Sequence, residues 1–164
     1  MNINPLISLI MGSDSDLPIM EKAIEVCKEF EIPYETKILS AHRTPNEHAE
    51  YARNAFGRGI KVIIAAAGMA AHLPGVTAAQ TIIPVIGVPI KSQFLDGMDS
   101  LLSIVQMPPG IPVATVGINA AKNAAILAVQ ILATADANLQ KKLENYKLQI
   151  AKQSIEKNKN ISKL

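Results

Sequence analysis

The sequence predicts one α/β domain of three layers, in which helices cover both faces of a parallel sheet. Apolar runs of strand length alternate with amphipathic stretches as far as residue 135, which is typical of repeated βα units. The run 62–66 is apolar at every position, as expected for a strand buried on both faces. A length of 164 residues with 49% hydrophobic and 18% charged residues fits a single domain of this kind.

The first half of the chain is expected to hold three strands, at residues 7–11, 34–39 and 61–67. Between the first two, apolar residues at helical spacing from Leu17 to Cys27 predict a helix, and Pro18 suits its first turn. A second helix is expected to open at residues 40–45 and to end at Gly57.

The second half is expected to hold two more strands and three helices: a short helix at 76–81, a strand at 84–89, a helix at 99–105, a strand at 113–116 and an Ala-rich helix at 119–133. Five strands in sequential βα units most simply take the flavodoxin-like order 2-1-3-4-5. Ligands of such sheets bind at the carboxyl ends of the strands. We therefore expect the loops 12–16, 40–44 and 68–75 to converge at that edge.

The last segment is expected to be an amphipathic helix. Its apolar residues recur at helical spacing, at Leu139, Leu143, Tyr146 and Ile150. We therefore divide the chain into a flavodoxin-like domain, 1–137, and a C-terminal helix, 138–164, that packs on a neighbouring subunit. Homo-oligomerisation would bury this apolar stripe.

The charge distribution argues against a nucleic-acid partner. The net charge is +2, but 9 of the 16 basic and 12 of the 14 acidic residues lie in residues 1–140, which therefore carry −3. The seven lysines from Lys141 onward are accompanied by one aromatic residue, Tyr146, and by no arginine. We interpret this run as a solvated helix face, with an anionic partner as the alternative.

Membrane and redox signals point to a cytoplasmic protein with no membrane contact. No stretch approaches the roughly 20 uninterrupted apolar residues of a membrane span, and residues 1–9 lack the basic start of a signal peptide. The single cysteine, Cys27, excludes an intrachain disulfide and a thiolate metal cage.

The loop 12–16 follows the first strand and opens a helix, where free backbone N–H groups favour an anion. Ser13 and Ser15 add hydroxyl donors, so a phosphorylated ligand is plausible. A carboxylate competes for the same N–H groups, and Asp16 is better suited to accept hydrogen bonds from ribose hydroxyls. The alternative is that residues 14–16 only cap the helix.

The loop 40–44 carries groups suited to phosphate binding and to proton transfer. Arg43 offers a guanidinium fork, Ser40 a hydroxyl, and His42 an imidazole that can titrate near neutrality. The alternative for His42 is a packing or capping role. We expect His48, in the polar helix that follows, to lie on the surface.

The loop 65–75 is rich in Gly and Ala, and His72 is its one hydrogen-bonding side chain. Such a loop could provide a ligand with an apolar wall and allow it to approach the backbone closely. The alternative is an ordinary packed turn. No metal is expected, because the three histidines and the carboxylates do not match a zinc signature. Flavin binding is disfavoured because the three loops contain no aromatic residue.

Four longer motifs occur in order along the chain: MGSDSD at 11–16, SAHRTP at 40–45, AAHLPG at 70–75, and SIVQMP at 103–108 followed by GIPV at 110–113. Together they resemble the 5-(carboxyamino)imidazole ribonucleotide mutases of purine biosynthesis. The resemblance covers about residues 6–135.

The resemblance implies that a carboxyl group moves from the exocyclic nitrogen of 5-(carboxyamino)imidazole ribonucleotide to ring carbon 4, by decarboxylation and recarboxylation. It implies no cofactor and no metal, and His42 as the general acid/base. It also implies a homo-octamer with active sites at subunit contacts. The implied substrate-binding residues come from the three loops: Ser13, Ser15 and Asp16, then Ser40 and Arg43, then Gly68 and His72.

Two other functions remain open. One is direct carboxylation of aminoimidazole ribonucleotide with CO2; as the resemblance has it, that branch carries Lys in place of Arg43 and lacks the pattern at 70–75, so the mutase is favoured. The other is a ribonucleotide-binding protein without catalysis, which would show no turnover with or without His42.

Overall fold

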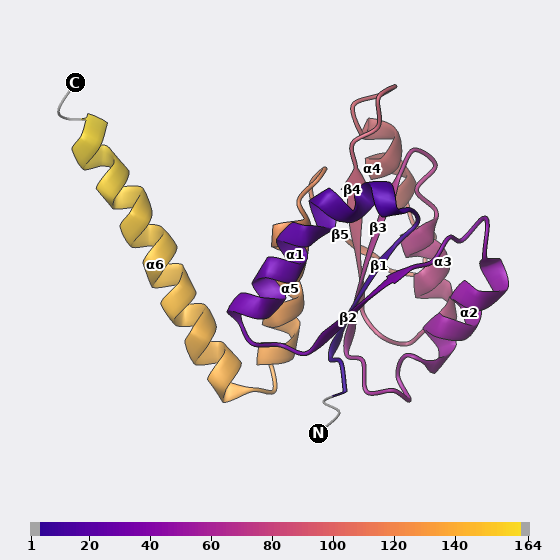
Figure 1. Cartoon of the computed structure of the whole chain (residues 1–164), viewed down its shortest axis with the longest axis horizontal. Helices are drawn as coiled ribbons and strands as arrows, with labels where there is room; N and C mark the ends of the chain where they lie inside the picture. Colours follow the sequence, from indigo (N-terminus) through magenta and orange to yellow (C-terminus); the bar gives the residue numbers. More distant parts are fainter. Residues whose placement is uncertain (1–3, 162–164) are drawn as a thin grey trace. The chain divides into compact units, whose positions relative to one another are not determined.

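The chain divides into two compact units, Met1–Ala128 and Val129–Leu164, and the boundary falls within a helix. Figure 1 shows the computed structural model, which describes residues 4–161. The first unit contains the sheet and the candidate site, and the second contains the long C-terminal helix.

The first unit is built on a parallel sheet of five strands: β1 (Ile7–Met11), β2 (Tyr34–Ile38), β3 (Val62–Gly68), β4 (Val85–Ile90) and β5 (Ala114–Thr115). The strand order is β2-β1-β3-β4-β5, and every pair is parallel. The flavodoxin-like order predicted from the sequence is therefore confirmed.

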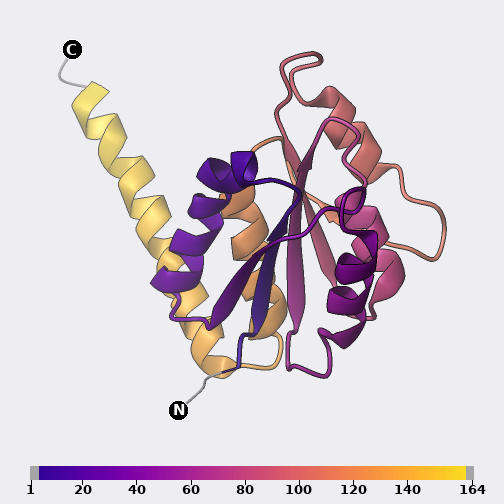
Figure 2. The ribbon, with the colours of Figure 1, turned by 45° about the vertical axis from the view of Figure 1, so that its right-hand side comes forward.

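The helices are α1 (Leu17–Glu29), α2 (Pro45–Asn54), α3 (Leu73–Gln80), α4 (Met98–Val105), α5 (Ala121–Ala133) and α6 (Ala137–Ile161), and a 3-10 turn, η1 (Asp14–Asp16), precedes α1. Figures 1 and 2 show α1 and the start of α5 on one face of the sheet and α2, α3 and α4 on the other. Every residue of β1 and β4 is buried, and so is β3 except for Gly68. These burial patterns confirm the three-layer architecture.

Close packing brings α4 directly onto β4. A Cβ added at Gly87 would lie 2.4 Å from Cγ2 of Ile104, which is closer than real side chains come. Ile104 is fully buried. Glycine is therefore required at this point of the strand for the helix to approach.

Several element boundaries differ from the prediction, among them the end of α2, which is at Asn54 instead of Gly57. The fifth strand is Ala114–Thr115 rather than 113–116, and beyond it the N–H of Val116 still donates to the carbonyl of Gly87 at 3.2 Å. Helix α3 begins at Leu73, because Pro74 lies in its first turn instead of in the preceding loop. Helix α5 begins after Asn119, whose φ of 57° is left-handed and cannot continue a helix.

The expectation that His48 lies on the surface is wrong. His48 is fully buried, and the buried residues of α2 are His48 and Ala52. Ala55 is buried too, so the three positions follow the i, i+4, i+7 spacing of an inward helix face. The spacing can be found in the sequence, but the charged residues around it make the helix look exposed on all sides.

The second unit holds the end of α5 and the helix α6. The carboxylate of Asp136 accepts hydrogen bonds from the N–H groups of Asn138 and Leu139 at 2.9 and 3.0 Å, which caps the start of α6. The predicted C-terminal helix is thus present. Among the described residues, no helix combines the length and the apolar character needed to cross a membrane.

Candidate functional site

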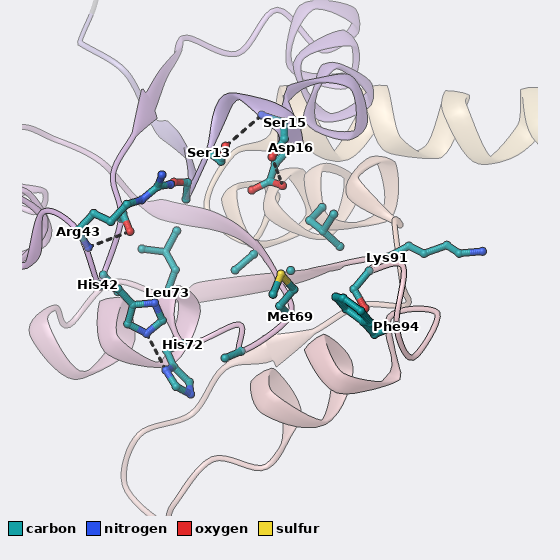
Figure 3. Close-up of a pocket in the computed structure, with 18 of the residues that line it drawn as sticks. Ser13, Ser15, Asp16, His42, Arg43, Met69, His72, Leu73, Lys91 and Phe94 are labelled. Atoms are coloured by element: carbon teal, nitrogen blue, oxygen red, sulfur yellow. Dashed lines mark hydrogen bonds between the residues drawn. The ribbon is translucent and has the colours of Figure 1, made fainter.

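A pocket of about 510 Å³ lies at the carboxyl ends of β1, β2, β3 and β4. This volume is within the range of about 300–1,000 Å³ that is usual for small-molecule sites. All eight residues predicted from the sequence line it: Ser13, Ser15, Asp16, Ser40, His42, Arg43, Gly68 and His72. Figure 3 shows that the labelled side chains of Ser13, Asp16, His42, Arg43 and His72 gather from separate loops.

The loop after β1 places two hydroxyls beside a buried carboxylate. Ser13 caps η1, because its Oγ accepts from the N–H of Ser15 at 3.3 Å. Asp16 occupies the N-cap position of α1, but among the described residues its carboxylate makes no capping hydrogen bond to that helix. The simple capping interpretation of Asp16 therefore has no support in the geometry.

Asp16 is 8% exposed although it lines the pocket. Burial raises the pKa of its carboxyl, and hydrogen bonds from Ser15 and the Ser13 backbone and the charge of Arg43 partly offset the rise. The Ser15 hydroxyl donates to its Oδ1 at a long 3.4 Å. The carboxylate thus keeps the capacity to accept hydrogen bonds from a ligand.

Arg43 joins the loop after β2 to the loop after β1. Its Nη2 donates to the carbonyl of Gly12 at 2.6 Å, and its backbone N–H donates to Oγ of Ser40 at 3.1 Å. The residue is exposed, and the remaining guanidinium N–H groups are available for an anion. Ser40 accepts in this arrangement, so its own hydroxyl proton is free to donate to a ligand.

His42 and His72 form a pair across the pocket wall. Nε2 of His42 lies 2.8 Å from Nδ1 of His72, and the rings meet edge to face with centroids 5.0 Å apart. One ring must donate and the other accept, so a proton is shared between them. Both residues are exposed, which leaves the pair accessible to a ligand (Figure 3).

The end of β3 supplies a strained apolar wall. Met69, which follows Gly68, has a φ of 56°, a left-handed conformation that is unfavourable for a side chain other than Gly or Asn. Such strain is concentrated at functional sites, where the surrounding structure holds it. Met69 is 58% exposed and lines the pocket.

The sequence reasoning missed the segment at the end of β4. Ile90, Lys91, Ser92, Gln93 and Phe94 also line the pocket. Nζ of Lys91 lies 2.9 Å from Asp96, and its backbone N–H donates to Oδ1 of Asn119 at 2.9 Å. The rule that placed the other three loops at the carboxyl edge applies equally to the strand 84–89, so this segment could have been predicted.

Phe94 also corrects the argument about aromatic residues. The three loops considered from the sequence contain none, but Phe94 lines the same pocket from the fourth and is 73% exposed. An aromatic face is thus available to stack on a planar ligand. Among residues 4–161, no group of three His, Cys, Asp or Glu side chains is arranged to hold a metal ion.

The fold and the pocket define a class of protein: a flavodoxin-like α/β protein with a polar pocket at the carboxyl edge of its sheet and a pair of histidines beside it. The chain belongs to the AIR carboxylase family, whose pattern matches residues 6–153. AIR denotes aminoimidazole ribonucleotide.

Relatives with different names resemble the chain closely. The N5-carboxyaminoimidazole ribonucleotide mutase of Pyrococcus abyssi is 64% identical over 143 residues, which make up 87% of this chain and 82% of that protein. The phosphoribosylaminoimidazole carboxylase of Saccharomyces cerevisiae is 58% identical over 146 residues, which cover 89% of this chain and 26% of the yeast protein.

A solved structure agrees with the fold. The crystal structure of PurE from Treponema denticola matches with a TM-score of 0.85 and 31% sequence identity, over 93% of this chain and 95% of that chain.

Proposed function

We propose that the chain is an isomerase of purine biosynthesis that converts N5-carboxyaminoimidazole ribonucleotide into 4-carboxy-5-aminoimidazole ribonucleotide. The observation that carries this proposal is the His42–His72 pair, whose 2.8 Å contact lies in the same pocket as Arg43 and Asp16. A proton-transfer group beside groups suited to phosphate and ribose is what this reaction requires. The Pyrococcus abyssi relative, 64% identical, carries the mutase name.

Binding is assigned to the loops after β1, β2 and β3. Arg43 and the hydroxyl of Ser40 hold the phosphate, because both have donors left over from their contacts within the protein. Asp16 accepts from the ribose hydroxyls, and the hydroxyls of Ser13 and Ser15, which donate to Asp14 and Asp16, lie beside it with lone pairs free to accept. The backbone at Gly68 and the ring of His72 then face the base and the carboxylate that is transferred.

His42 acts first as an acid. It protonates the exocyclic nitrogen of the carbamate, the bond from that nitrogen to the carboxyl carbon breaks, and CO2 and neutral aminoimidazole ribonucleotide remain in the pocket. The apolar wall at Ala67, Met69 and Ala70 keeps CO2 close to the ring.

His42 then acts as a base. The electron-rich ring attacks CO2 through carbon 4, and the neutral imidazole takes the proton that leaves this carbon. The proton used in the first step is thereby restored, so the cycle needs no net proton exchange. His72 keeps its hydrogen bond to His42 through the contact at 2.8 Å and so holds the neutral imidazole in place while the ribonucleotide moves.

The test is conversion of freshly prepared carbamate substrate, followed by ultraviolet absorbance, in buffer with isotopically labelled bicarbonate. Unlabelled product would support transfer of the substrate's own carboxyl group. Fully labelled product, formed only from aminoimidazole ribonucleotide and bicarbonate, would instead identify a carboxylase, the activity in the name of the yeast relative. Ligand binding without turnover of either substrate would identify a binding protein.

The assembly proposed is a homo-octamer, with α6 covered by a neighbouring subunit. Leu148, Ile150 and Ile155 on this helix are exposed in the single chain, which supports an apolar contact between subunits. Light scattering should give the mass of eight chains, and removal of residues 138–164 should lower it. An unchanged mass after removal would contradict this role of the helix.

A further inference from the structure

Two histidine contacts connect the starts of α2 and α3, one exposed and one buried. At the pocket, Nε2 of His42 lies 2.8 Å from Nδ1 of His72 (Figure 3). In the core, Nε2 of His48 lies 2.8 Å from Oγ1 of Thr77, and both of these residues are 0% exposed. The first contact belongs to the site already described, whereas the second is linked to the pocket lining by the hydrogen bond from Thr77 to Leu73.

The direction of the buried hydrogen bond follows from its neighbours. The hydroxyl of Thr77 donates its proton to the carbonyl of Leu73 at 2.7 Å, since a carbonyl can only accept. Oγ1 of Thr77 must therefore accept from His48, so the proton of the neutral His48 ring lies on Nε2. Nδ1 of His48 is buried and has no hydrogen-bond partner among the residues that the structure describes.

Packing alone does not account for this arrangement. An apolar pair of similar volume would bury the same surface and would leave no ring nitrogen unpaired in the core. A buried polar contact of this kind costs stability unless it provides something that apolar packing lacks. What the His48–Thr77 bond provides is a directional contact between two helix starts, α2 and α3, which pack against each other.

On the α3 side, the bond reaches the first turn of the helix that carries His72. His72 is the N-cap of α3, and its carbonyl accepts from the N–H of Val76 at 2.9 Å. Thr77 is bonded in turn to the carbonyl of Leu73, the residue next to His72. Movement of Thr77 would therefore be transmitted to His72 within one helical turn.

On the α2 side, the bond reaches the turn that carries His42. The N–H of His48 donates to the carbonyl of Thr44 at 3.0 Å, and the N–H of Thr44 donates to the carbonyl of Ser40 at 3.0 Å. The Thr44 hydroxyl donates to the same carbonyl at 3.1 Å, which fixes the turn 40–44 around His42. The His42–His72 and His48–Thr77 contacts thus close a ring of hydrogen bonds and backbone. At the far ends of the two helices, Nε of Arg53 also donates to Oε1 of Gln80 at 2.8 Å.

We propose that His48 and Thr77 are positioning residues, which hold the turn of His42 and the turn of His72 at the separation where the two imidazoles share a proton. This inference rests on the proposed function for its kinetic consequence, but its geometric consequence does not depend on the substrate. The buried bond keeps the helix starts in place while the exposed pair exchanges protons with the ligand.

The kinetic test compares variants that differ in one hydroxyl or one N–H group. Thr77→Val removes the hydroxyl at nearly constant volume, and Thr77→Ser keeps it; His48→Met removes the donor, and His48→Gln keeps one. Since misplacement of catalytic groups lowers kcat, we expect Thr77→Val and His48→Met to reduce kcat about tenfold, with KM changed less than about twofold. Thr77→Ser and His48→Gln should restore most of kcat.

A matched control separates positioning from loss of stability. Ile7→Val removes a buried methyl group at the amino end of β1, far along the sheet from the pocket, and should lower the unfolding temperature with kcat unchanged. The double variant His48→Met/Thr77→Val should lose no more kcat than either single variant, because both remove the same bond. Equal kcat in Thr77→Val and wild type, or equal losses in Thr77→Val and Thr77→Ser, would overturn the proposal.

Nitrogen-15 spectra of the histidine rings provide a readout that needs no substrate. The untagged chain has three histidines, so each imidazole can be followed separately. We expect His48 to carry its proton on Nε2, and Thr77→Val, but not Thr77→Ser, to shift the signals of His42 and His72. Unshifted signals in Thr77→Val would overturn the inference. If Thr77→Val shifts the signals but the wild type shows no turnover, the proposed function alone is refuted and the positioning role stands.

Discussion

Two polar clusters lie at opposite ends of β1 and β2 and use the same kinds of side chain differently. The pocket at the carboxyl ends contains a carboxylate, an arginine and serine hydroxyls. The cluster at the amino ends joins a serine, a tyrosine, a glutamate and an arginine, namely Ser8, Tyr51, Glu35 and Arg58. The two differ in how much of their hydrogen-bonding capacity is used within the protein.

In the cluster at the amino ends, the polar groups bond mainly to one another, and among the described residues only Nη2 of Arg58 is buried there without a hydrogen-bond partner. The hydroxyl of Tyr51 donates to Glu35, so Ser8 must donate to Tyr51, at 2.5 Å. Nη1 of Arg58 lies 2.8 and 3.0 Å from the two carboxylate oxygens of Glu35, and the guanidinium stacks over the ring of Tyr51 at 4.5 Å. Burial and the hydrogen bond to Glu35 raise the pKa of Tyr51 to about 12, so it stays neutral.

The pocket is open by comparison. Arg43 donates to the backbone carbonyl of Gly12 rather than to a carboxylate, and Asp16 is bonded only by its own loop, by a long hydrogen bond from Ser15 and by the Ser13 backbone. Unused donors and acceptors cost stability in a buried cluster but provide affinity in a binding site. Residue type alone therefore does not distinguish the site from the rest of the protein. What marks it is a set of charged groups that the fold leaves without strong partners.

The largest effect should come from His42→Asn. Removal of the acid/base group should lower turnover about 10²–10⁴-fold, because general acid–base catalysis contributes a factor of that order. Ribonucleotide affinity should change little, since binding is assigned to other residues. Turnover and calorimetric binding on the same preparations check this prediction.

The matched control for His42→Asn is Tyr51→Phe, which removes a proton-bearing group from the cluster at the amino ends. Its turnover should equal that of the wild type. Wild-type turnover in His42→Asn would exclude His42 as the acid/base. The pocket would then differ from the cluster at the amino ends in open hydrogen-bonding groups but not in a catalytic histidine.

The second effect should come from Asp16→Ala, which removes the open carboxylate. A hydrogen bond to a charged group is worth about 1.5–3 kcal/mol, so affinity for the ribonucleotide should fall about 10–100-fold. Affinity for inorganic phosphate, which has no ribose, should fall much less. Asp14→Ala is the control, because it removes the same charge from an exposed residue outside the pocket lining. Equal losses for both ligands would show that Asp16 acts on the loop and not on ribose.

Asp16 should also limit stability. Burial raises the folded-state pKa of this carboxyl above its unfolded value, so the favourable contribution of the protonated form is lost as pH rises through the folded pKa. At neutral pH the ionised group therefore destabilises the fold. Asp16→Asn should unfold at a higher temperature than the wild type at pH 7, although it binds the ribonucleotide less tightly.

Much of this architecture could be predicted from the sequence, because apolar runs and turn residues are local signals. The continuous apolar run in β3 identified a strand covered on both faces, and the loops after β1, β2 and β3 were placed correctly at one edge. Residues such as Ser13 and His72 lie far apart in the chain, but parallel strands bring their carboxyl ends together.

What could not be predicted depends on tertiary contacts. His48 was expected on the surface because its neighbours in α2 are charged, and the structure buries it against Thr77 of α3. The 2.8 Å contact between His42 and His72 depends on how α2 and α3 are placed, which no local pattern encodes. Segment 90–94 is a different case, since it follows β4 at the same carboxyl edge and its place in the pocket can be predicted from the strand alone.

A third effect tests the cluster at the amino ends itself. Tyr51→Phe leaves Ser8 and Glu35 without a shared partner in a partly buried place, so the free energy of unfolding should fall by about 1–2 kcal/mol. Chemical denaturation of the variant beside wild type measures the change. Ser8→Ala should cost less, because it leaves the contact between Tyr51 and Glu35 in place. Unaltered stability in Tyr51→Phe would mean that the hydrogen bonds of Tyr51 add nothing to the free energy of unfolding, because the same groups bond equally well to water in the unfolded chain.

The smallest effect concerns the pH dependence of stability and extends the comparison to the histidines. Burial lowers the pKa of His48, which in the unfolded chain is near 6.5. Above that pH the ring is neutral in both the folded and the unfolded chain. As the pH falls below it, the unfolded chain binds a proton but the folded chain does not, so the free energy of unfolding declines until the folded pKa is reached. One such proton contributes at most about 1.4 kcal/mol per pH unit. The unfolding free energy of the wild type should therefore fall more steeply between pH 7 and 5 than that of His48→Met, in which the exposed His42 and His72 are retained. Parallel slopes in the two proteins would show that His48 takes up a proton as readily in the fold as in the open chain, so burial of the unpaired Nδ1 would not be what keeps this ring neutral.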